Sequence, residues 1–324
     1  MLNTQTPVVE HMGREVVIGL DLGGTKCAVS VLEHGRVREV LRIPTGQFAP
    51  TFELLFNAIK SVEVAGSSVM IGVSCGGPLD SVKGIILSPP NLHPSWYRVA
   101  IVDQLMARFD GRACLMNDAN CCALAEWKFG AGRGTQHMVF LTSGTGMGGG
   151  LILNGQLYEG ATGDAGEIGH VRLSADGPVG YGKIGSVEGF CSGGGIARLA
   201  ERWVGESIEP KPSWAQGTIT AKQVAEAARA GEPLARRIMA ESGTRFGEAL
   251  AILIDLFNPE RIVLGGLFPA ARDLLEPTLN AAVEREALPI PRGACQILPA
   301  ELGETIGSHG AVAAALYYLE RNPA

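Results

Sequence analysis

Short apolar runs bounded by glycines predict strands in this chain, and longer stretches with apolar residues at helical spacing predict helices. The predicted strands are Val16–Leu22, Cys27–Leu32, Val37–Arg42, Val69–Ser74, Ala113–Met116, Met138–Thr142, Leu151–Tyr158 and Arg261–Leu264. The predicted helices are Phe52–Val64, Ile101–Phe109, Cys121–Phe129, Phe190–Trp203, Lys222–Arg229, Leu234–Leu256, Ala271–Arg285 and Gly307–Leu319. The order β-β-β-α-β-α-β in the first part of the chain predicts an α/β protein with mixed sheets.

The segment 143–150 between two predicted strands consists almost entirely of small residues. Its glycines let backbone N–H groups approach a ligand closely, which suits a phosphate, and a tight hairpin explains them equally well. Gly144, Gly146 and Gly149 match G-x-G-x-x-G, with Asp164 at a spacing typical of a ribose-binding acid. A dinucleotide site requires a helix directly after the glycines, and a strand follows here, so we reject that interpretation.

A second glycine turn follows the first predicted strand, where Asp21 precedes Gly23, Gly24, Thr25 and Lys26. The spacing from Gly19 to Gly24 is that of a P-loop, but Thr25-Lys26 replaces the required Lys-Ser/Thr, which excludes this motif. An acid at a strand end beside free N–H groups predicts Mg²⁺ coordination by Asp21, through water, and a phosphate on the turn. The alternative is an exposed acid that caps an ordinary turn.

Asn117 and Asp118 end another predicted strand and open the helix after it. A helix N-terminus favours an ionised carboxylate, and both residue types are common N-caps. Only one of the two is needed as a cap, so the other polar side chain is available for a ligand or for chemistry.

Segments 21–35 and 142–155 share the order strand, glycine turn, strand and turn, which indicates a weak internal repeat. Two copies of one α/β unit that face each other would form a central cleft lined by both glycine turns, although β-hairpins also resemble one another by chance. Gly265 and Gly266 follow the last predicted strand. Small residues there would admit a flat ring such as adenine, and a packing turn is an equal alternative.

The bulk composition narrows the class of protein. The 324 residues suffice for two medium domains, and a net charge of −6 without a Lys/Arg cluster disfavours nucleic acid or a membrane surface as a partner. Residues 1–15 lack the apolar core of a signal peptide, and no apolar run approaches the ~20 residues of a membrane span. The seven cysteines form no C-x-x-C pair, which is typical of buried thiols in a reduced cytoplasm. They are Cys27, Cys75, Cys114, Cys121, Cys122, Cys191 and Cys295.

Four motifs occur together in a specific order: D-x-G-G-T, N-D-A-N, S-G-T-G-x-G-G-G and A-G-E-I-G-H. With them the chain, over residues 16–320, resembles the ROK family of bacterial sugar kinases and regulators. The resemblance implies a two-domain ribonuclease H-like, actin-like ATPase fold with a central cleft, as in hexokinase, actin and Hsp70. It places a smaller domain at 1–117 plus 307–324 and a larger one at 118–306, and it implies a cytoplasmic homodimer.

The resemblance also implies ATP- and Mg²⁺-dependent phosphorylation of a hexose or N-acetylhexosamine, usually at the 6-hydroxyl, with Asp118 as the general base. Residues that match sugar-binding positions are Asn91, Asn117, Glu167, His170 and Glu188. Residues that match phosphate-binding positions are Gly23, Gly24, Thr25, Lys26, Gly144, Thr145 and Gly146, with Gly265 and Gly266 in the adenosine region. If both Glu167 and His170 bind sugar, 166–170 must be a turn or an irregular loop, because a regular strand would point them to opposite faces.

One departure from the family concerns its structural zinc site, formed by the G-H histidine and three cysteines. Val179, Tyr181 and Ser186 stand where those cysteines would be, and none of the three is a good zinc ligand, so we predict no zinc. His170 then needs another group to orient it, and our hypothesis is that Tyr181 or Ser186 provides this.

Three other functions compete with a sugar kinase. A sugar-responsive regulator would carry a DNA-binding helix-turn-helix, for which the ~15 residues ahead of the first strand are too few. A catalytically silent sugar-binding protein is suggested by the altered zinc site, although the base, phosphate and sugar motifs are all present. An Hsp70-like ATPase would carry a β-rich peptide-binding domain, which the predicted elements do not contain.

Overall fold

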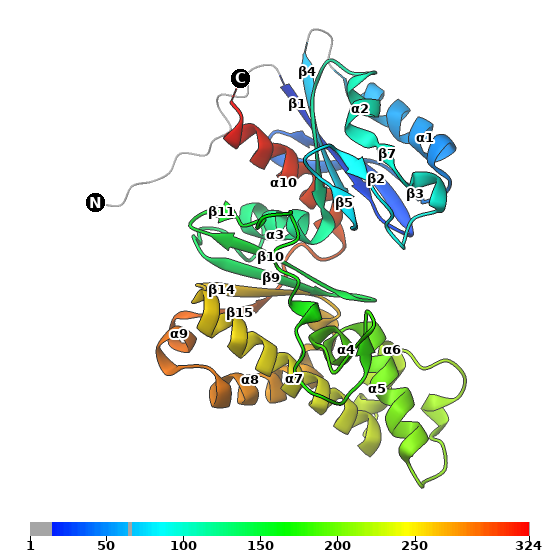
Figure 1. The fold of residues 1–324 in the computed structure, drawn as a ribbon, viewed down its shortest axis with the longest axis vertical. Coiled ribbons are helices and arrows are strands. Elements are labelled where there is room, and N and C mark those ends of the chain that lie inside the picture. Colours follow the sequence, from blue (N-terminus) through cyan, green and yellow to red (C-terminus); the bar gives the residue numbers. More distant parts are fainter. Residues whose placement is uncertain (1–14, 64–66, 324) are drawn as a thin grey trace. The chain divides into compact units, whose positions relative to one another are not determined.

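The computed structural model describes residues 15–63 and 67–323, which form two compact units (Figure 1). Unit 1 comprises the chain up to residue 128 together with 304–324, and unit 2 comprises 129–303. The sequence placed these divisions at 117/118 and 306/307, so unit 1 contains one more helix than expected. The polar stretch 1–14 and Val64, the end of one predicted helix, lie outside the described residues.

Unit 1 is built on two sheets and a set of helices. Its strands are β1 (Glu15–Leu22), β2 (Lys26–Glu33), β3 (Arg36–Pro44), β4 (Ser68–Cys75), β5 (Leu79–Asp80), β6 (Ile85–Ile86), β7 (Val99–Ala100) and β8 (Gly111–Asn117). Its helices are α1 (Phe48–Ser61), α2 (Ile101–Met106), α3 (Asp118–Phe129) and α10 (Ile306–Arg321), with short 3₁₀ turns η2 (Pro94–Trp96) and, at the unit boundary, η5 (Gly303–Thr305).

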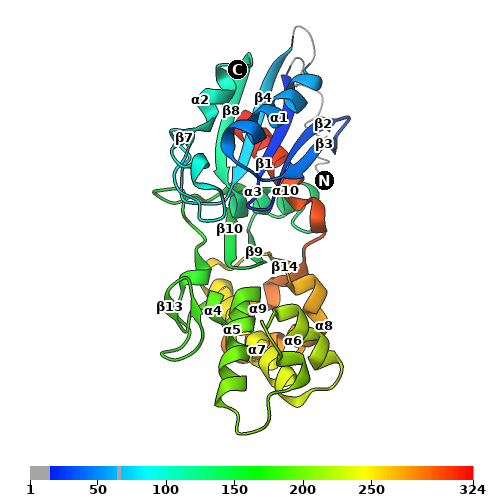
Figure 2. The same cartoon turned by 90° about the vertical axis from the view of Figure 1, so that its right-hand side faces the viewer.

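The main sheet of unit 1 has the strand order β3-β2-β1-β4-β8. Strands β1 to β3 are antiparallel neighbours, whereas β4 and β8 run parallel to β1. Alternate residues of β1 face opposite sides, as the two-residue period of a strand requires. Ile18 packs in the cluster that contains α1 and α2, and Val17 packs against α10. Figure 2 shows these helices beside the sheet.

Helix α10 lies unusually close to the sheet because two paired strand residues are glycines. Gly19 and Gly72 are register partners on β1 and β4. A Cβ at Gly19 would lie 2.7 Å from the Val312 amide nitrogen, and one at Gly72 would overlap the Ala311 carbonyl oxygen. A side chain at either position would push the helix away, so these two glycines allow α10 to pack closely against the sheet.

Unit 2 contains a second sheet with a helical layer. Its strands are β9 (Met138–Ser143), β10 (Met147–Leu153), β11 (Gln156–Leu157), β12 (Val179–Gly180), β13 (Lys183–Ile184), β14 (Arg261–Gly266) and β15 (Gln296–Pro299). Its helices are α4 (Val187–Cys191), α5 (Gly193–Glu206), α6 (Ala221–Arg229), α7 (Pro233–Phe257), α8 (Phe268–Glu286) and α9 (Pro289–Ala294), with 3₁₀ turns η3 (Ile168–His170) and η4 (Ser213–Ala215).

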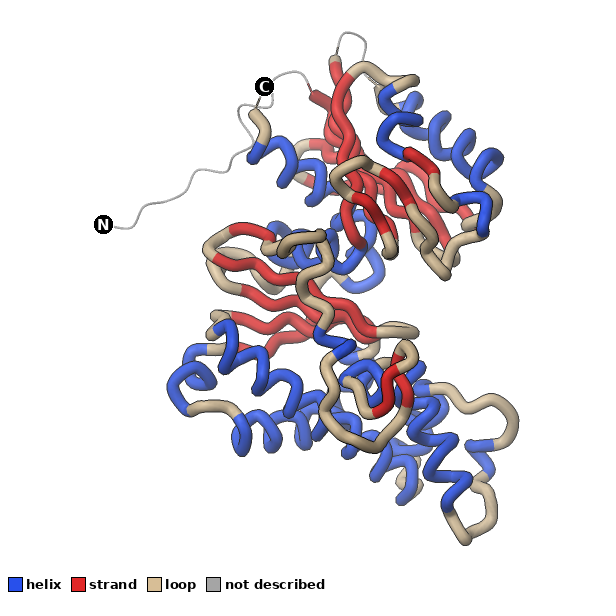
Figure 3. The backbone as a smooth tube through the Cα atoms, in the orientation of Figure 1, coloured by secondary structure: helices blue, strands red, loops and turns tan. Residues whose placement is uncertain are grey.

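The main sheet of unit 2 has the order β11-β10-β9-β14-β15. The three strands of its β9–β11 meander are antiparallel, and β14 and β15 are parallel to β9. This is the order of the unit 1 sheet, so the weak repeat in the sequence corresponds to two sheets of the same topology. Val139 and Leu141 of β9 pack with Phe246 and Leu250 of α7 in the core of this unit. Helices α7 and α8 lie below the sheet in Figure 3.

The predicted helix Phe190–Trp203 is wrong as a single element. Ser192 has extended backbone angles, and its hydroxyl accepts a hydrogen bond from the Gly195 amide at 2.9 Å. This side-chain cap ends α4 and starts α5, because a serine oxygen satisfies an amide that the helix leaves unpaired. Strand β15 and helix α9 were not predicted, since both are short and neither has a clear period.

All seven cysteines are free thiols. Cys27, Cys75, Cys121 and Cys191 are buried, and burial raises the thiol pKa of each. No helix among the described residues has both the length and the apolar content needed to cross a bilayer.

Candidate active site

The carboxyl ends of three parallel strands bring the candidate acids of unit 1 to one edge of its sheet. Asp21 on β1 pairs with Ser74 on β4, and Cys75 on β4 pairs with Asn117 on β8. Asp118 follows Asn117 directly and is the first residue of α3. The edge therefore gathers the proposed metal-binding acid and the N-D-A-N motif within one unit, as strand order predicts for α/β sheets.

Asn117 provides the helix cap that the sequence left open between two residues. Its Oδ1 accepts a hydrogen bond from the Ala119 amide at 2.9 Å. Asp118 Oδ1 accepts from the same amide at 2.8 Å, while Asp118 Oδ2 lies near Gly76. The Asp118 side chain is exposed at the edge. Because Asn117 already caps α3, Asp118 keeps one carboxylate oxygen for other partners.

The two carboxyl groups at this edge have perturbed pKa values. The pKa of Asp21 is raised to about 6, mainly by burial and also by the negative charge of Asp118, whereas Ser74, Arg42 and Lys26 act in the opposite direction. The pKa of Asp118 is also raised, mainly because protein surrounds its carboxyl group even though solvent reaches the side chain. Two acids that repel each other at one edge favour the binding of a cation or a proton.

The beginning of α10 lies directly behind Asp21. A Cβ at Gly307, in the first turn of this helix, would overlap the Asp21 carboxylate. A helix N-terminus favours a nearby negative charge, so α10 offsets part of the repulsion that Asp21 experiences. The sequence placed a helix here but gave no sign that it abuts Asp21.

The β1–β2 turn is a closed hairpin with an exposed tip. The Gly23 amide donates to the Lys26 carbonyl at 3.1 Å, and the Thr45 hydroxyl donates to the Gly23 carbonyl at 2.6 Å. No residue in the described ranges accepts a hydrogen bond from the exposed amides of Gly24 and Thr25. Adjacent unpaired amides at a turn form an anion-binding concavity, so Gly23 has a structural part and the next two amides remain for a ligand.

Asn91 lies against this hairpin. A Cβ on Gly24 would come within 2.7 Å of the Asn91 Cβ and 2.8 Å of its carbonyl oxygen. Only glycine admits the loop that carries Asn91 at this distance. The structure therefore brings one predicted sugar-binding residue next to one predicted phosphate-binding residue, both in unit 1.

The β9–β10 hairpin of unit 2 has a similar tip. The Gly144 amide donates to the Gly146 carbonyl at 2.9 Å, and the carbonyls of Gly144 and Thr145 accept from the Gly193 and Gly194 amides at 2.8 and 3.2 Å. The glycines that begin α5 thus anchor the hairpin. Within the part of the chain that the structure describes, the amides of Thr145 and Gly146 have no acceptor.

Glu188 on α4 reaches this hairpin directly. Its Oε2 accepts a hydrogen bond from the Met147 amide at 3.0 Å, and a Cβ on Gly146 would lie 2.8 Å from the same oxygen. The Glu188 side chain is partly buried. A residue that the sequence assigned to the sugar alone therefore also contacts the predicted phosphate-binding turn.

Glu167 and His170 lie on an irregular turn, the geometry that the sequence predicted if both side chains bind one sugar. Glu167 precedes the 3₁₀ turn η3, which ends at His170, and Glu167 Oε2 is 3.7 Å from His170 Nε2. The Tyr181 ring packs edge-on against the imidazole with 5.1 Å between ring centroids, and Lys183 Nζ donates to the His170 carbonyl at 2.7 Å. Glu167, His170 and the hairpin β12–β13 are thus neighbours in unit 2.

Of the two side chains that were predicted to orient His170, one contacts its ring and the other has a different partner. Tyr181 contacts its ring, whereas the Ser186 hydroxyl accepts from the Gly189 amide at 3.1 Å and caps α4. Cys191 is buried and directs its thiol to the Ser242 carbonyl at 3.9 Å. Among the described residues no group of three or more His, Cys, Asp or Glu side chains could hold a metal ion. The absence of zinc stays a prediction.

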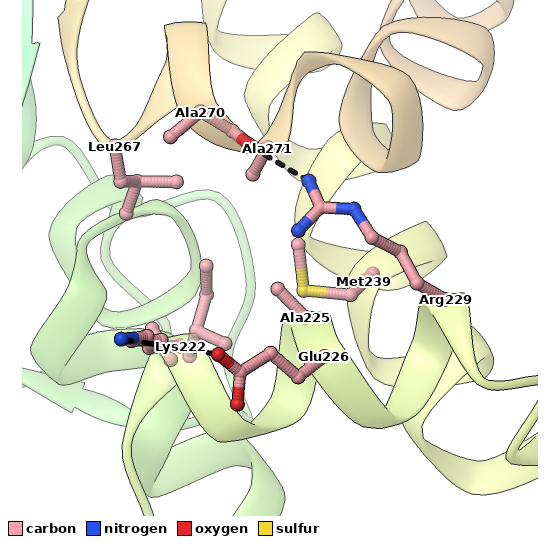
Figure 4. Close-up of a pocket in the computed structure, with 10 residues that line it drawn as sticks. Lys222, Ala225, Glu226, Arg229, Met239, Leu267, Ala270 and Ala271 are labelled. Carbon is pink, nitrogen blue, oxygen red and sulfur yellow. Dashed lines mark hydrogen bonds and ion pairs between the residues drawn. The ribbon is translucent and has the colours of Figure 1, made fainter.

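A cavity of about 360 Å³ is lined by Leu267, the residue that follows Gly265 and Gly266 where β14 passes into α8 (Figure 4). It is lined by Ile196, Ala221, Lys222, Ala225, Glu226, Arg229, Met239, Leu267, Ala270 and Ala271. A Cβ on Gly193 would lie 2.9 Å from the Gly144 carbonyl oxygen and 3.7 Å from Leu267 Cδ2. The cavity wall and the β9–β10 tip are therefore separated by one glycine. Sequence analysis found Gly265 and Gly266 but missed the lining residues.

Comparison with known proteins adds independent findings. A sequence model of the ROK family matches residues 17–317. The glucokinase of Thermotoga maritima is 32% identical over 304 residues, 91% of this chain and 95% of its own. The crystal structure of a ROK hexokinase from Thermus thermophilus has a TM-score of 0.81 at 29% identity and covers 95% of this chain and 100% of its own.

A ROK glucokinase from Streptomyces griseus, solved in complex with glucose and AMPPNP, has a TM-score of 0.69 at 31% identity, with 93% of this chain and 98% of its own covered. The xylose repressor of Caldicellulosiruptor bescii is 29% identical over 80% of this chain and 68% of its own. The expected two-domain, actin-like α/β class is confirmed by these neighbours. Because the family model spans nearly the whole chain, this protein belongs to the ROK family.

Proposed function

We propose that this protein is an ATP-dependent sugar kinase that phosphorylates the 6-hydroxyl of a hexose or N-acetylhexosamine. The observation that carries the proposal is the position of Asp118. It stands at the carboxyl edge of a sheet with one oxygen uncommitted, because Asn117 performs the capping that would otherwise occupy it. The glucokinases that match the chain over nine-tenths of its length support the reaction class.

Asp118 serves as the general base in this proposal. Phosphoryl transfer needs little covalent help from the protein, and a base must orient the hydroxyl and accept its proton. The raised pKa of Asp118 makes its carboxylate a better proton acceptor than an ordinary aspartate. Water must be kept from the same position, or the donor would be hydrolysed without a sugar.

The candidate sugar ligands are amides, carboxylates and one imidazole, and each unit contributes its own set. Asn91 and Asn117 act from unit 1, and Glu167, His170 and Glu188 act from unit 2. Sugar hydroxyls both donate and accept hydrogen bonds, so this mixture of side chains suits them. None of these groups distinguishes glucose from mannose or their N-acetyl derivatives, which share most of these hydroxyls.

The nucleotide uses the unpaired amides and the cavity. The candidate phosphate ligands of unit 1 are the tip amides of Gly24 and Thr25 and the Lys26 ammonium, and those of unit 2 are the tip amides of Thr145 and Gly146. The adenine ring occupies the cavity between α5, α6, α7 and α8, whose apolar walls suit a flat ring. Only Gly193 separates this cavity from the β9–β10 tip. The adenine ring and the phosphates of one nucleotide must lie close together in this way.

Mg²⁺ would bind at Asp21, through water, and would neutralise the charge of the transferring phosphate. Mg²⁺ usually takes only one or two carboxylates from a protein and completes its shell with water and phosphate oxygens. The repulsion between Asp21 and Asp118 fits a site that gains from a cation.

A coupled assay of ADP release with a panel of hexoses and N-acetylhexosamines tests the function. We expect ADP formation that depends on at least one sugar and on Mg²⁺, with the phosphate on the 6-hydroxyl by NMR of the product. ADP release that no sugar increases, or sugar binding without any turnover, would favour a regulatory or catalytically silent ROK protein instead.

A further inference from the structure

Glu188 joins two parts of unit 2 that the proposed function treats separately. It is the second residue of α4, and the Ser186 cap fixes the beginning of that helix. From there its Oε2 accepts the Met147 amide at 3.0 Å, at the first residue of β10. No described residue donates to its second oxygen, Oε1.

The side chain occupies a narrow slot bordered by backbone. On one side is the hairpin tip, where a Cβ on Gly146 would be 2.8 Å from Oε2. On another side is the turn η3, where a Cβ on Gly169 would be 3.5 Å from the Glu188 Cβ and 3.0 Å from the Met147 carbonyl oxygen. Because Oε2 lies against the hairpin tip, a movement of the Glu188 carboxylate within this slot would change its contact with Gly146 and Met147.

We infer that Glu188 is a positioning residue for the nucleotide phosphates in addition to a sugar ligand, and that it couples the two binding events. The inference rests on the proposed function. One carboxylate oxygen holds Met147 and with it the adjoining amides of Thr145 and Gly146, while the other receives a sugar hydroxyl. A sugar bound to Oε1 restricts the carboxylate and thereby orders the tip before the nucleotide arrives.

Nucleotide binding in the absence of sugar tests the positioning role by itself. Binding of MgADP is measured by calorimetry for the wild type, Glu188→Gln and Glu188→Ala, with thermal unfolding to verify that each variant is folded. Gln keeps an acceptor oxygen for the Met147 amide, so its affinity stays within about twofold. Ala removes the acceptor and weakens binding about tenfold, the size expected for loss of one hydrogen bond to a charged group.

Two further variants isolate the contact. Glu209→Ala removes an exposed carboxylate of unit 2 that lies outside the candidate site, and is expected to leave sugar-free MgADP affinity unchanged. Gly146→Ala retains Glu188 but places a Cβ against Oε2, where only the end of a flexible side chain must move. It is expected to weaken MgADP binding as Glu188→Ala does.

The coupling is measured by repeating the MgADP titration at saturating D-glucose. Glucose should increase nucleotide affinity in the wild type, and by linkage MgADP should increase glucose affinity by the same factor. In Glu188→Ala the factor should fall to about one, whereas Glu188→Gln should retain it in part.

Equal or tighter MgADP binding by Glu188→Ala would overturn the positioning role, and an unchanged coupling factor in that variant would overturn the link. These results differ from a failure of the proposed function, in which the wild type itself would bind no MgADP or show no effect of any sugar.

Discussion

At the scale of single residues, the site depends on acids held where they repel each other. Asp21 sits beside Asp118 and against the start of α10, and its pKa is raised to about 6. An acid whose pKa rises on folding opposes folding once it ionises. The protein therefore retains Asp21 at some expense of stability, as is common for functional sites.

Replacement of Asp21 by Asn should remove this pH dependence. Between about pH 4 and 6 the folded wild type binds more protons at Asp21 than the unfolded chain, so its free energy of unfolding falls as pH rises. Asn cannot ionise, and Asp21→Asn should become more stable than the wild type above pH 6, by at most about 3 kcal/mol because solvent partly screens the group. Melting curves from pH 4 to 8 measure this.

Melting temperatures that differ by a constant amount across that range would show that Asp21 has an ordinary pKa in the folded protein. The same variant should lose Mg²⁺-dependent activity, so a rise in stability together with a loss of turnover is the expected signature.

At the scale of elements, two glycine hairpins have the same shape but different surroundings. A Cβ added to Gly24 would overlap Asn91, whereas a Cβ added to Gly144 would have no atom within 4 Å. The structure thus separates a glycine required by packing from one that packing does not require, a distinction that the two sequence motifs do not reveal.

Gly24→Ala should destabilise unit 1, since the loop with Asn91 must move, at a cost of about 1–3 kcal/mol. Gly144→Ala should change the melting temperature by less than 1–2 °C, because its Cβ meets open space and its φ is not positive. Differential scanning calorimetry of the pair tests this. Equal destabilisation by both would mean that Gly24 is not in contact with Asn91.

A third prediction concerns the cavity between α5, α6, α7 and α8, where we place the adenine ring. Ala225→Phe on α6 fills the cavity and should raise the KM for ATP at least about tenfold while leaving the KM for sugar unchanged. Ala230→Phe, one turn further and exposed, is the matched control and should affect neither. A variant Ala225→Phe with unaltered KM for ATP would place the base elsewhere.

The elements also show what a sequence can supply. Both hairpins, the strand-end acids and the capping pair at Asn117 and Asp118 follow from buried apolar runs that stop at polar residues. The cavity did not follow, since its walls come from α5, α6, α7 and α8 and no local pattern relates Ile196 to Ala225 or Ala271. The break at Ser192 was missed because a side-chain cap interrupts an otherwise helical pattern.

At the scale of the whole molecule, the two units contain main sheets of the same topology. Each ends its first strand in a glycine hairpin with two unpaired tip amides, which explains the weak repeat in the sequence. Sequence spacing alone could not give the unit boundary at residue 128, because the helix Asp118–Phe129 continues without interruption from the N-D-A-N motif. The proposed homodimer stays a prediction for sedimentation analysis.

Metal content is a property of the whole chain. Because Val179, Tyr181 and Ser186 replace cysteines and Tyr181 packs on His170, the purified protein should hold less than about 0.1 zinc per chain. EDTA should leave its melting temperature unchanged. Elemental analysis that finds one tightly held zinc per chain would refute this.

The most direct test of the central claim is the turnover of Asp118→Asn with its best sugar. Asn preserves size and the hydrogen bond from the Ala119 amide but cannot accept the hydroxyl proton. We predict that kcat falls at least about 100-fold while the sugar dissociation constant changes less than about threefold. A kcat equal to that of the wild type would contradict the assignment of Asp118 as the base of a sugar kinase.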